Sequence, residues 1–219
     1  MQFIIGLYRG GIKDKIMEFT SQIGQDKWVC EYFNYKKGGY FLDIGANDGV
    51  YFSNTLYLEK ELGWKGLCVE AGKTPFRKLV KNRTCDCTYV FVSDEEKMVD
   101  FKEFIYDKYK RRKKNTVQTV QTIQSLPLAI LLKNYEVPKV IDYVSIDVEG
   151  FDYQVLLGFP FDKYEVILWT IEHNLYFGSS VQKDNIKNIM FKNGYIFAKE
   201  NMGDKTNIFE DWYINKKYV

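Results

Sequence analysis

The sequence lacks the features that would place it among membrane proteins or binders of polyanions. No apolar run approaches the roughly 20 residues that a transmembrane helix needs. Its 31 Lys and Arg nearly balance its 29 Asp and Glu, so the net charge of +2 indicates no nucleic-acid partner. Residues 1–9 carry neither a basic leader nor a small-residue cleavage site. We therefore expect a cytoplasmic protein without a membrane span.

Histidine and cysteine are also scarce. His173 is the only histidine, and it is far in sequence from the four cysteines at positions 30, 68, 85 and 87. A structural zinc site needs about four nearby ligands. We therefore expect reduced thiols rather than a zinc centre.

Few breaks interrupt the chain, which has four prolines and no low-complexity tract. A length of 219 residues favours a single domain over residues 1–219. Residues 1–20 match no motif, so we expect an extension there or a junction with a longer protein.

Short apolar segments alternate with stretches of helical spacing along most of the chain. We predict strands at 40–44, 66–70, 88–92, 141–146 and 165–171. Helices are expected within 12–34, near 53–62, after 74, near 126–134, at 151–157 and at 181–193. We expect 97–104 to pair with 88–92, and 195–198 with 209–214. The alternation predicts a doubly wound α/β sheet with one antiparallel strand.

The first of these strands runs into an acid and a glycine-spaced turn, Asp43-Ile44-Gly45-Ala46-Asn47-Asp48-Gly49. Glycines let a backbone turn tightly and approach a ligand closely. The spacing is not the dinucleotide G-x-G-x-x-G, no basic residue lies in the turn, and its two aspartates would repel a pyrophosphate. We expect Asp43, Gly45, Asn47 and Gly49 to form part of a site for a cationic, phosphate-free nucleoside. S-adenosylmethionine is the commonest such ligand.

The next strand ends in Glu70, at the spacing expected of an acid that accepts hydrogen bonds from ribose hydroxyls. Ser93 and Asp94 follow the third strand and are candidates for the adenine side, although 93–96 also has the composition of a plain turn. In such sheets the ligand lies beyond the carboxyl ends of the strands.

Two further strand ends carry candidate catalytic residues. Asp147 and Glu149 follow one strand and can orient a hydroxyl, hold a metal or accept a proton, and Asp147 is also a candidate for the cofactor side. The simpler alternative is that Asp147 caps the next helix. His173 follows the neighbouring strand and is our first choice as general base, ahead of Asp147. Its alternative is a core histidine with its hydrogen bonds satisfied.

The basic run 108–114 fits either a solvated loop or a lid over an acidic or sugar substrate, with Tyr106 and Tyr109 as stacking faces.

Five segments in this order resemble the FkbM family of S-adenosylmethionine-dependent methyltransferases: Ser21-Gln22-x-x-Gln25-Asp26, residues 41–49, residues 63–70, residues 141–150 and Ile171-Glu172-His173-Asn174. The resemblance covers residues 20–215. It implies a Rossmann-like class I methyltransferase fold, with a mostly parallel seven-stranded sheet and a C-terminal antiparallel hairpin. It also implies O-methylation, commonly of a sugar or polyketide hydroxyl. By position, Asp43, Gly45 and Glu70 match its cofactor motif, and Asp147, Glu149 and His173 match its acidic and Glu-His-Asn segments.

We therefore predict an O-methyltransferase that acts on a sugar hydroxyl of a glycan or glycoconjugate, either alone or as part of a longer glycan-building protein. One alternative is an NAD-dependent oxidoreductase or epimerase acting on a sugar nucleotide. Another is a non-catalytic binding module on a degenerate methyltransferase fold. A divalent metal is left open and is not favoured, because a hard ion such as Mg²⁺ prefers oxygen ligands to histidine.

Overall fold

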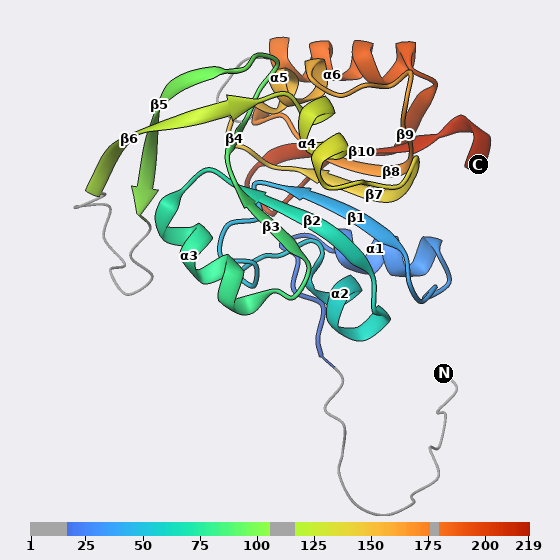
Figure 1. Cartoon of the computed structure of the whole chain (residues 1–219). Coiled ribbons are helices and arrows are strands. Elements are labelled where there is room, and N and C mark those ends of the chain that lie inside the picture. The colour runs from blue at the N-terminus through green and yellow to red at the C-terminus, as the bar shows by residue number, and fades with distance from the viewer. Residues whose placement is uncertain (1–16, 106–116, 176–179) are drawn as a thin grey trace, which may run out of the picture.

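The computed structural model describes residues 17–105, 117–175 and 180–219 (Figure 1). Its main sheet has seven strands in the spatial order β3 (Asp86–Tyr89), β2 (Lys65–Glu70), β1 (Tyr40–Ile44), β7 (Val140–Ile146), β8 (Glu165–Glu172), β10 (Ile208–Asn215) and β9 (Tyr195–Gly203). The strands from β3 to β8 in this order run parallel, and β10 is antiparallel to both of its neighbours. The predicted fold, including the C-terminal antiparallel hairpin, is confirmed.

Helices cover both faces of this sheet (Figure 1). One face packs against α1 (Gln25–Tyr32), α2 (Leu56–Leu62) and α3 (Lys73–Asn82). The other packs against α4 (Leu128–Asn134), α5 (Asp152–Leu157) and α6 (Val181–Lys192). Side chains alternate between these faces along each strand, so Phe41 joins the first core, and Leu42 and Ile44 join the second. The central strands read as continuous apolar runs because both of their faces are buried.

A second, three-stranded sheet corrects one prediction. Its order is β4 (Phe91–Val92), β6 (Val117–Leu126) and β5 (Lys97–Ile105). The expected pairing of 97–104 with 88–92 is wrong, because β5 pairs antiparallel with β6, and β4 pairs parallel with β6. The single strand expected at 88–92 is also divided at Val90, with β3 in the main sheet and β4 in the second. The apolar residues of β6 recur at every third position rather than at every second, so the sequence did not indicate a strand there.

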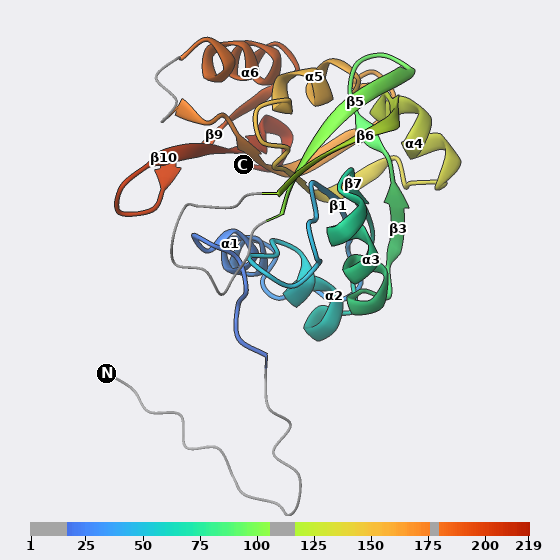
Figure 2. The same ribbon diagram turned by 90° about the vertical axis from the view of Figure 1, so that its left-hand side faces the viewer.

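The β5–β6 hairpin, which we call the arm, projects from the body on the side toward which the parallel strands run (Figure 1). Seen from that side, it crosses in front of β1 and β7 (Figure 2). The basic run 108–114, with Tyr106 and Tyr109, lies outside the described residues. Throughout the part of the chain that the structure describes, the helices are too short or too polar to cross a bilayer.

Candidate active site

The carboxyl ends of β1, β2 and β7 are tied together by backbone hydrogen bonds. The amides of Gly45 and Ala46 donate to the carbonyl of Val69, at 2.9 and 3.0 Å. The amide of Asp147 donates to the carbonyl of Ile44 at 2.9 Å. The predicted meeting of these three strand ends is therefore observed, and they form the candidate site.

Glu70 lies at the end of β2 with both carboxylate oxygens held by backbone amides. The amide of Asn47 donates to Oε2 at 2.7 Å, and the amide of Gly72 donates to Oε1 at 2.6 Å. Asn47 has a left-handed φ of 50°, and its observed contact with Glu70 is made by its backbone amide. This half-buried group therefore lies, with a fixed orientation, at the strand end where an acid that binds a ribose is expected, so Glu70 fits the predicted cofactor.

Gly45 and Gly49 are required by the packing of the turn itself. Gly45 has φ +94°, and a Cβ atom there would lie 1.8 Å from the carbonyl oxygen of Asp147. Gly49 has φ +78°, and its Cβ would lie 2.7 Å from the side chains of Leu79 and Arg83. The sequence suggested close approach to a ligand, whereas the structure shows close approach to neighbouring protein.

Asp43 is 5 % exposed and faces α2 rather than the open edge of the sheet. Thr55 donates its hydroxyl to this carboxylate at 2.6 Å, and the Arg83 guanidinium lies 3.9 Å away. Burial raises the pKa of Asp43, and Arg83 and Thr55 oppose that rise. Arg83 also forms an ion pair with Glu59 and donates to Thr55 at 2.9 Å. These contacts hold the loop after β1 in place. Neither Arg83 nor Glu59 belongs to a recognisable motif, so the sequence did not identify them.

Buried hydrogen-bond acceptors lie on the α1 face of the sheet near these strand ends. Asn54 donates to Ser145 at 2.9 Å, but its Oδ1 atom is buried with no protein partner. Gln25 donates to Oε2 of Glu210 at 2.7 Å, while Oε1 of Glu210 has no protein partner. An acceptor without a protein partner, such as Oδ1 of Asn54, suits a donor-bearing group like the positive amino end of S-adenosylmethionine better than it suits a pyrophosphate.

Three acids gather at the ends of β7 and β8. Asp147 and Glu149 are exposed, and Glu149 has the strained φ of +54°. The Asp147 carboxylate hydrogen-bonds to that of Glu172, which is 8 % exposed. Burial and then the nearby carboxylates raise the pKa of Glu172 to about 11. Although Asp147 is exposed as a residue, neighbouring groups enclose its carboxylate, and this desolvation together with the like charge of Glu149 raises the pKa of Asp147 to about 6. Of these two carboxyl groups, Glu172 has the higher pKa, so a proton shared between them is held more tightly by Glu172 than by Asp147.

Asp152, which the sequence did not single out, fixes the loop that carries Asp147. Its carboxylate accepts the amides of Val148 and Gly150, at 3.0 and 3.1 Å. Gln182 of α6 donates to the same carboxylate at 2.9 Å. The expected alternative that Asp147 caps the helix is not observed, because α5 begins after Phe151 without a side-chain cap.

His173 does not converge with Asp147, contrary to the expectation that both would face one reaction centre. Successive residues of an extended strand point to opposite faces, so Glu172 turns toward Asp147 while His173 turns away. The imidazole is fully buried, with Nε2 at 3.6 Å from Oδ1 of Asp211 and the amide of Leu175 donating to Nδ1 at 3.3 Å. His173 is therefore a core side chain, but its Nε2 atom has no hydrogen-bond partner among the described residues, so the alternative of a histidine with satisfied hydrogen bonds is met only at Nδ1.

Ser93 and Asp94 follow β4, which belongs to the second sheet. Ser93 is buried and donates its hydroxyl to Asp94 at 2.9 Å, while its amide donates to the carbonyl of Leu126 at 3.2 Å. They form the turn that enters β5. Their predicted contact with adenine stays a prediction.

Metal and thiol chemistry receive no further support from the described residues. Across 17–105, 117–175 and 180–219, no three His, Cys, Asp or Glu side chains are arranged to hold an ion. All four cysteines are free thiols, and the Sγ atoms of Cys68 and Cys85 lie 3.5 Å apart. Metal dependence stays open.

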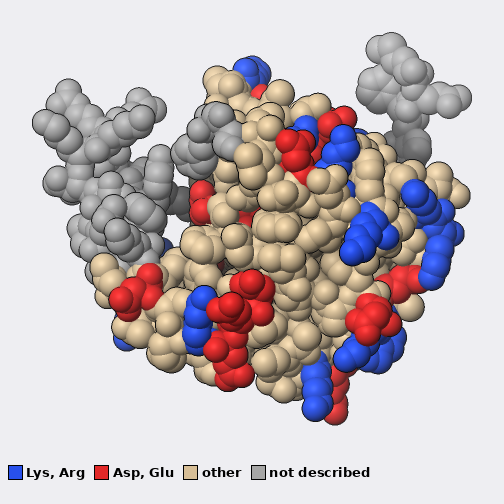
Figure 3. Space-filling view, turned by 90° about the horizontal axis from the view of Figure 1, so that it is seen from above, with Lys and Arg blue, Asp and Glu red and all other residues tan. Residues whose placement is uncertain are grey.

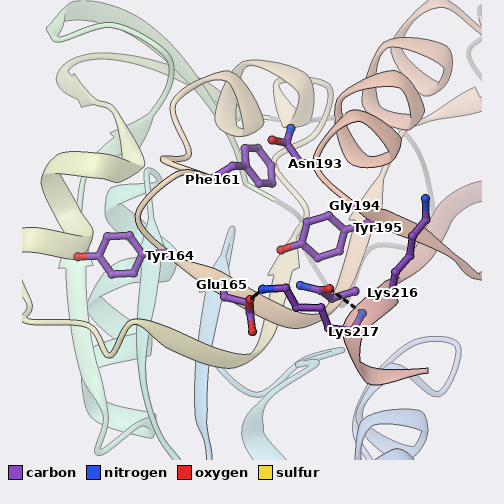
Figure 4. A pocket seen from close by; sticks show the side chains of 9 residues that line it. Phe161, Tyr164, Glu165, Asn193, Gly194, Tyr195, Lys216 and Lys217 are labelled. Atoms are coloured by element: carbon purple, nitrogen blue, oxygen red, sulfur yellow. Dashed lines mark hydrogen bonds and ion pairs between the residues drawn. The ribbon is translucent and has the colours of Figure 1, made fainter.

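A pocket of about 240 Å³ lies at the end of the main sheet opposite the candidate site, beside the first residue of β8 (Figure 4). Glu165 lies in it, held by Lys217 and by the hydroxyl of Tyr218 at 2.5 Å. Because parallel strands place their ligands at their carboxyl ends, this pocket is separate from the candidate site.

Comparison with known proteins agrees with this geometry. Residues 43–197 match the sequence model of the Methyltransferase FkbM domain. The chain belongs to the FkbM methyltransferase family. This membership implies S-adenosylmethionine as methyl donor. No curated protein sequence gives a significant match.

Solved structures show the same fold as this FkbM chain. The methyltransferase FkbM from Methylobacillus flagellatus KT is 12 % identical with a TM-score of 0.56, and the match covers 81 % of this chain and 43 % of that one. The METTL16 methyltransferase domain is 12 % identical with a TM-score of 0.53, and the match covers 87 % of this chain and 65 % of that one. This FkbM chain thus spans less than half of the Methylobacillus protein.

Proposed function

We propose that this FkbM chain transfers a methyl group from S-adenosylmethionine to a hydroxyl of a sugar, within a glycan or glycoconjugate. The observation that carries the proposal is the placement of two acids at the carboxyl ends of β2 and β7, the strands on either side of β1. Backbone amides orient the carboxylate that would bind a ribose, Glu70, and the raised pKa of Asp147 suits it to accept a proton.

The cofactor side rests on Glu70 and on Asn54. Glu70 would bind the ribose hydroxyls, and the unpartnered Oδ1 of Asn54 suits the positive amino end. When bound, S-adenosylmethionine supplies a methyl group on a positively charged sulfur. Asp43 and Gly45 support the loop around it, through Thr55 and through the close approach to β7.

On the acceptor side, we now place Asp147 ahead of His173 as the proton acceptor. A carboxylate with a pKa near 6 is ionised at neutral pH and is basic enough to take a proton from a hydroxyl as the new bond forms. Glu172, through its hydrogen bond with Asp147, fixes the orientation of that carboxylate. Holding the hydroxyl oxygen in line with the methyl carbon supplies much of the rate enhancement.

Several features near the site favour a carbohydrate. Sugars present both hydroxyls and apolar C–H faces, so they bind to polar groups combined with exposed aromatic rings. Tyr51 and Phe52, in the loop after β1, are about half exposed, with ring centroids 4.0 Å apart. Phe151, just after the loop of Asp147 and Glu149, is also about half exposed. On the face above α5 and α6 (Figure 3), acidic and basic side chains are interspersed, which does not favour a nucleic acid on that face.

The proposal is tested with purified protein in two steps. Calorimetric titration with S-adenosylhomocysteine should show binding, and incubation of S-adenosylmethionine with candidate glycans should add one methyl group by mass spectrometry. Binding without transfer to any hydroxyl-bearing acceptor would favour a non-catalytic module. A change in nicotinamide absorbance with a sugar nucleotide would instead favour the oxidoreductase alternative. Loss of transfer in EDTA, restored by Mg²⁺ or Mn²⁺, would make Asp147 and Glu149 metal ligands.

A further inference from the structure

The inner face of the arm touches the turn that follows Glu70. Along β6, Ile123 and Ser125 are buried against the body, whereas Val120, Thr122 and Gln124 are exposed on the outer face. Gln121 shares the inner face by strand alternation. Its side chain contacts the turn after Glu70, on the cofactor side of the candidate site.

The side-chain amide of Gln121 makes two hydrogen bonds to the body. Its Nε2 donates to the carbonyl oxygen of Ala71 at 2.8 Å. Its Oε1 accepts the hydroxyl of Tyr89 at 2.8 Å. Tyr89 is paired in register with Glu70 across β2 and β3, and its ring packs on Phe76 with centroids 5.3 Å apart. Gln121 is therefore held in place by Tyr89 and directed at Ala71.

The turn at Ala71-Gly72 contains a glycine whose backbone amide helps to hold Glu70. Glycine has wide backbone freedom, and a side chain is excluded at Gly72 because a Cβ atom would lie 2.6 Å from Cγ of Pro75. The amide of Gly72 is nevertheless among the donors that hold the Glu70 carboxylate. A shift of the Ala71 carbonyl rotates the peptide unit that carries this amide, so the orientation of Glu70 depends on what holds Ala71.

We propose that Gln121 is a positioning residue of the cofactor site, which acts on Glu70 through Ala71 and Gly72. The arm is then part of the cofactor site and not only an addition beside it. This inference rests on the proposed binding of the ribose by Glu70.

The test is the dissociation constant of S-adenosylhomocysteine, measured by calorimetry on the full chain. Gln121→Met keeps the length of the side chain and its neutrality but removes both hydrogen bonds. Because one hydrogen bond of ordinary strength is lost from the support of Glu70, we expect binding to weaken by about three- to ten-fold. Gln124→Met is the matched control. It makes the same change on the outer face of the same strand, where Gln124 bonds only to Glu96 at 3.1 Å, and its affinity should stay within about two-fold of wild type.

A double-mutant cycle separates positioning from a general effect on the fold. If Gln121 acts through Glu70, Gln121→Met should cost less affinity in a Glu70→Gln background than in wild type. Equal, additive losses would overturn the inference, as would equal losses in Gln121→Met and Gln124→Met. Wild-type binding with no loss in Gln121→Met would overturn this inference alone. Failure of the wild type to bind S-adenosylhomocysteine would overturn the proposed function as well.

Discussion

Glu70 connects the sequence motif to the proposed cofactor most directly, since backbone amides fix the orientation of both of its carboxylate oxygens. The spacing of the motif predicted the acid. It could not predict the amide donors, because these depend on how the turns after β1 and β2 fold against each other.

Glu70→Ala should weaken binding of S-adenosylmethionine by about 1–3 kcal/mol, the range for a lost hydrogen-bond partner that is charged. The residue lies half-buried at a strand end, so the protein should still fold. Calorimetry measures the affinity, and thermal unfolding checks the fold. An unchanged affinity would remove Glu70 from the cofactor site.

Asp147→Asn should lower turnover by about 10²-fold or more, as expected when a general base is lost. In the wild type, the rate should fall as the pH drops through about 6, because Asp147 must be ionised to accept a proton. A pH–rate profile measures this limb, and Asp147→Asn should lack it.

His173→Ala is the comparison for Asp147→Asn. The imidazole is buried on the other face of the sheet, beside Asp211, so its loss should lower stability more than turnover. If His173→Ala instead lost about 10²-fold in turnover while staying folded, the base would be His173, as the sequence first suggested.

At the scale of elements, the sequence located most helices and strands of the main sheet, since their apolar periodicity reflects burial. It failed at β5 and β6, which lie at the edge of the body and bury only part of their surface. It also placed His173 beside Asp147, because a pattern of strand ends does not say which face each side chain takes. Glu172 and His173 are neighbours in sequence, yet the strand turns them to opposite sides.

The turn after β1 offers a test at this scale. Gly45→Ala places a Cβ atom against the Asp147 carbonyl and forces a left-handed φ on alanine. Gly38→Ala is the matched control, because Gly38 has φ +71° but open space around its Cβ position. Gly38→Ala should cost about 1–2 kcal/mol, and Gly45→Ala clearly more. Chemical denaturation measures both, and equal losses would mean that close packing between β1 and β7 is not required.

At the scale of the whole molecule, the sheet buries carboxyl groups that make stability depend on pH. Glu210 is 5 % exposed with one oxygen unpartnered, and burial raises its pKa to about 8. The folded protein therefore binds this proton more tightly than the unfolded chain does. Stability should fall as the pH rises from about 4.5 toward 8, by at most about 1.4 kcal/mol per pH unit from this group.

Urea denaturation at several pH values measures this dependence in the wild type and in Glu210→Gln. Glutamine cannot ionise, so the variant should lose less stability than the wild type over the same range. Parallel curves for the two proteins would show that Glu210 is already ionised in the folded state.

The account as a whole depends on where the cofactor binds, and a crystal structure with S-adenosylhomocysteine tests this most directly. We predict that the ribose hydroxyls lie within hydrogen-bonding distance of the Glu70 carboxylate, with the sulfur on the side of Asp147. A ligand bound elsewhere, for example in the pocket beside Glu165 at the opposite end of the sheet, would contradict the account.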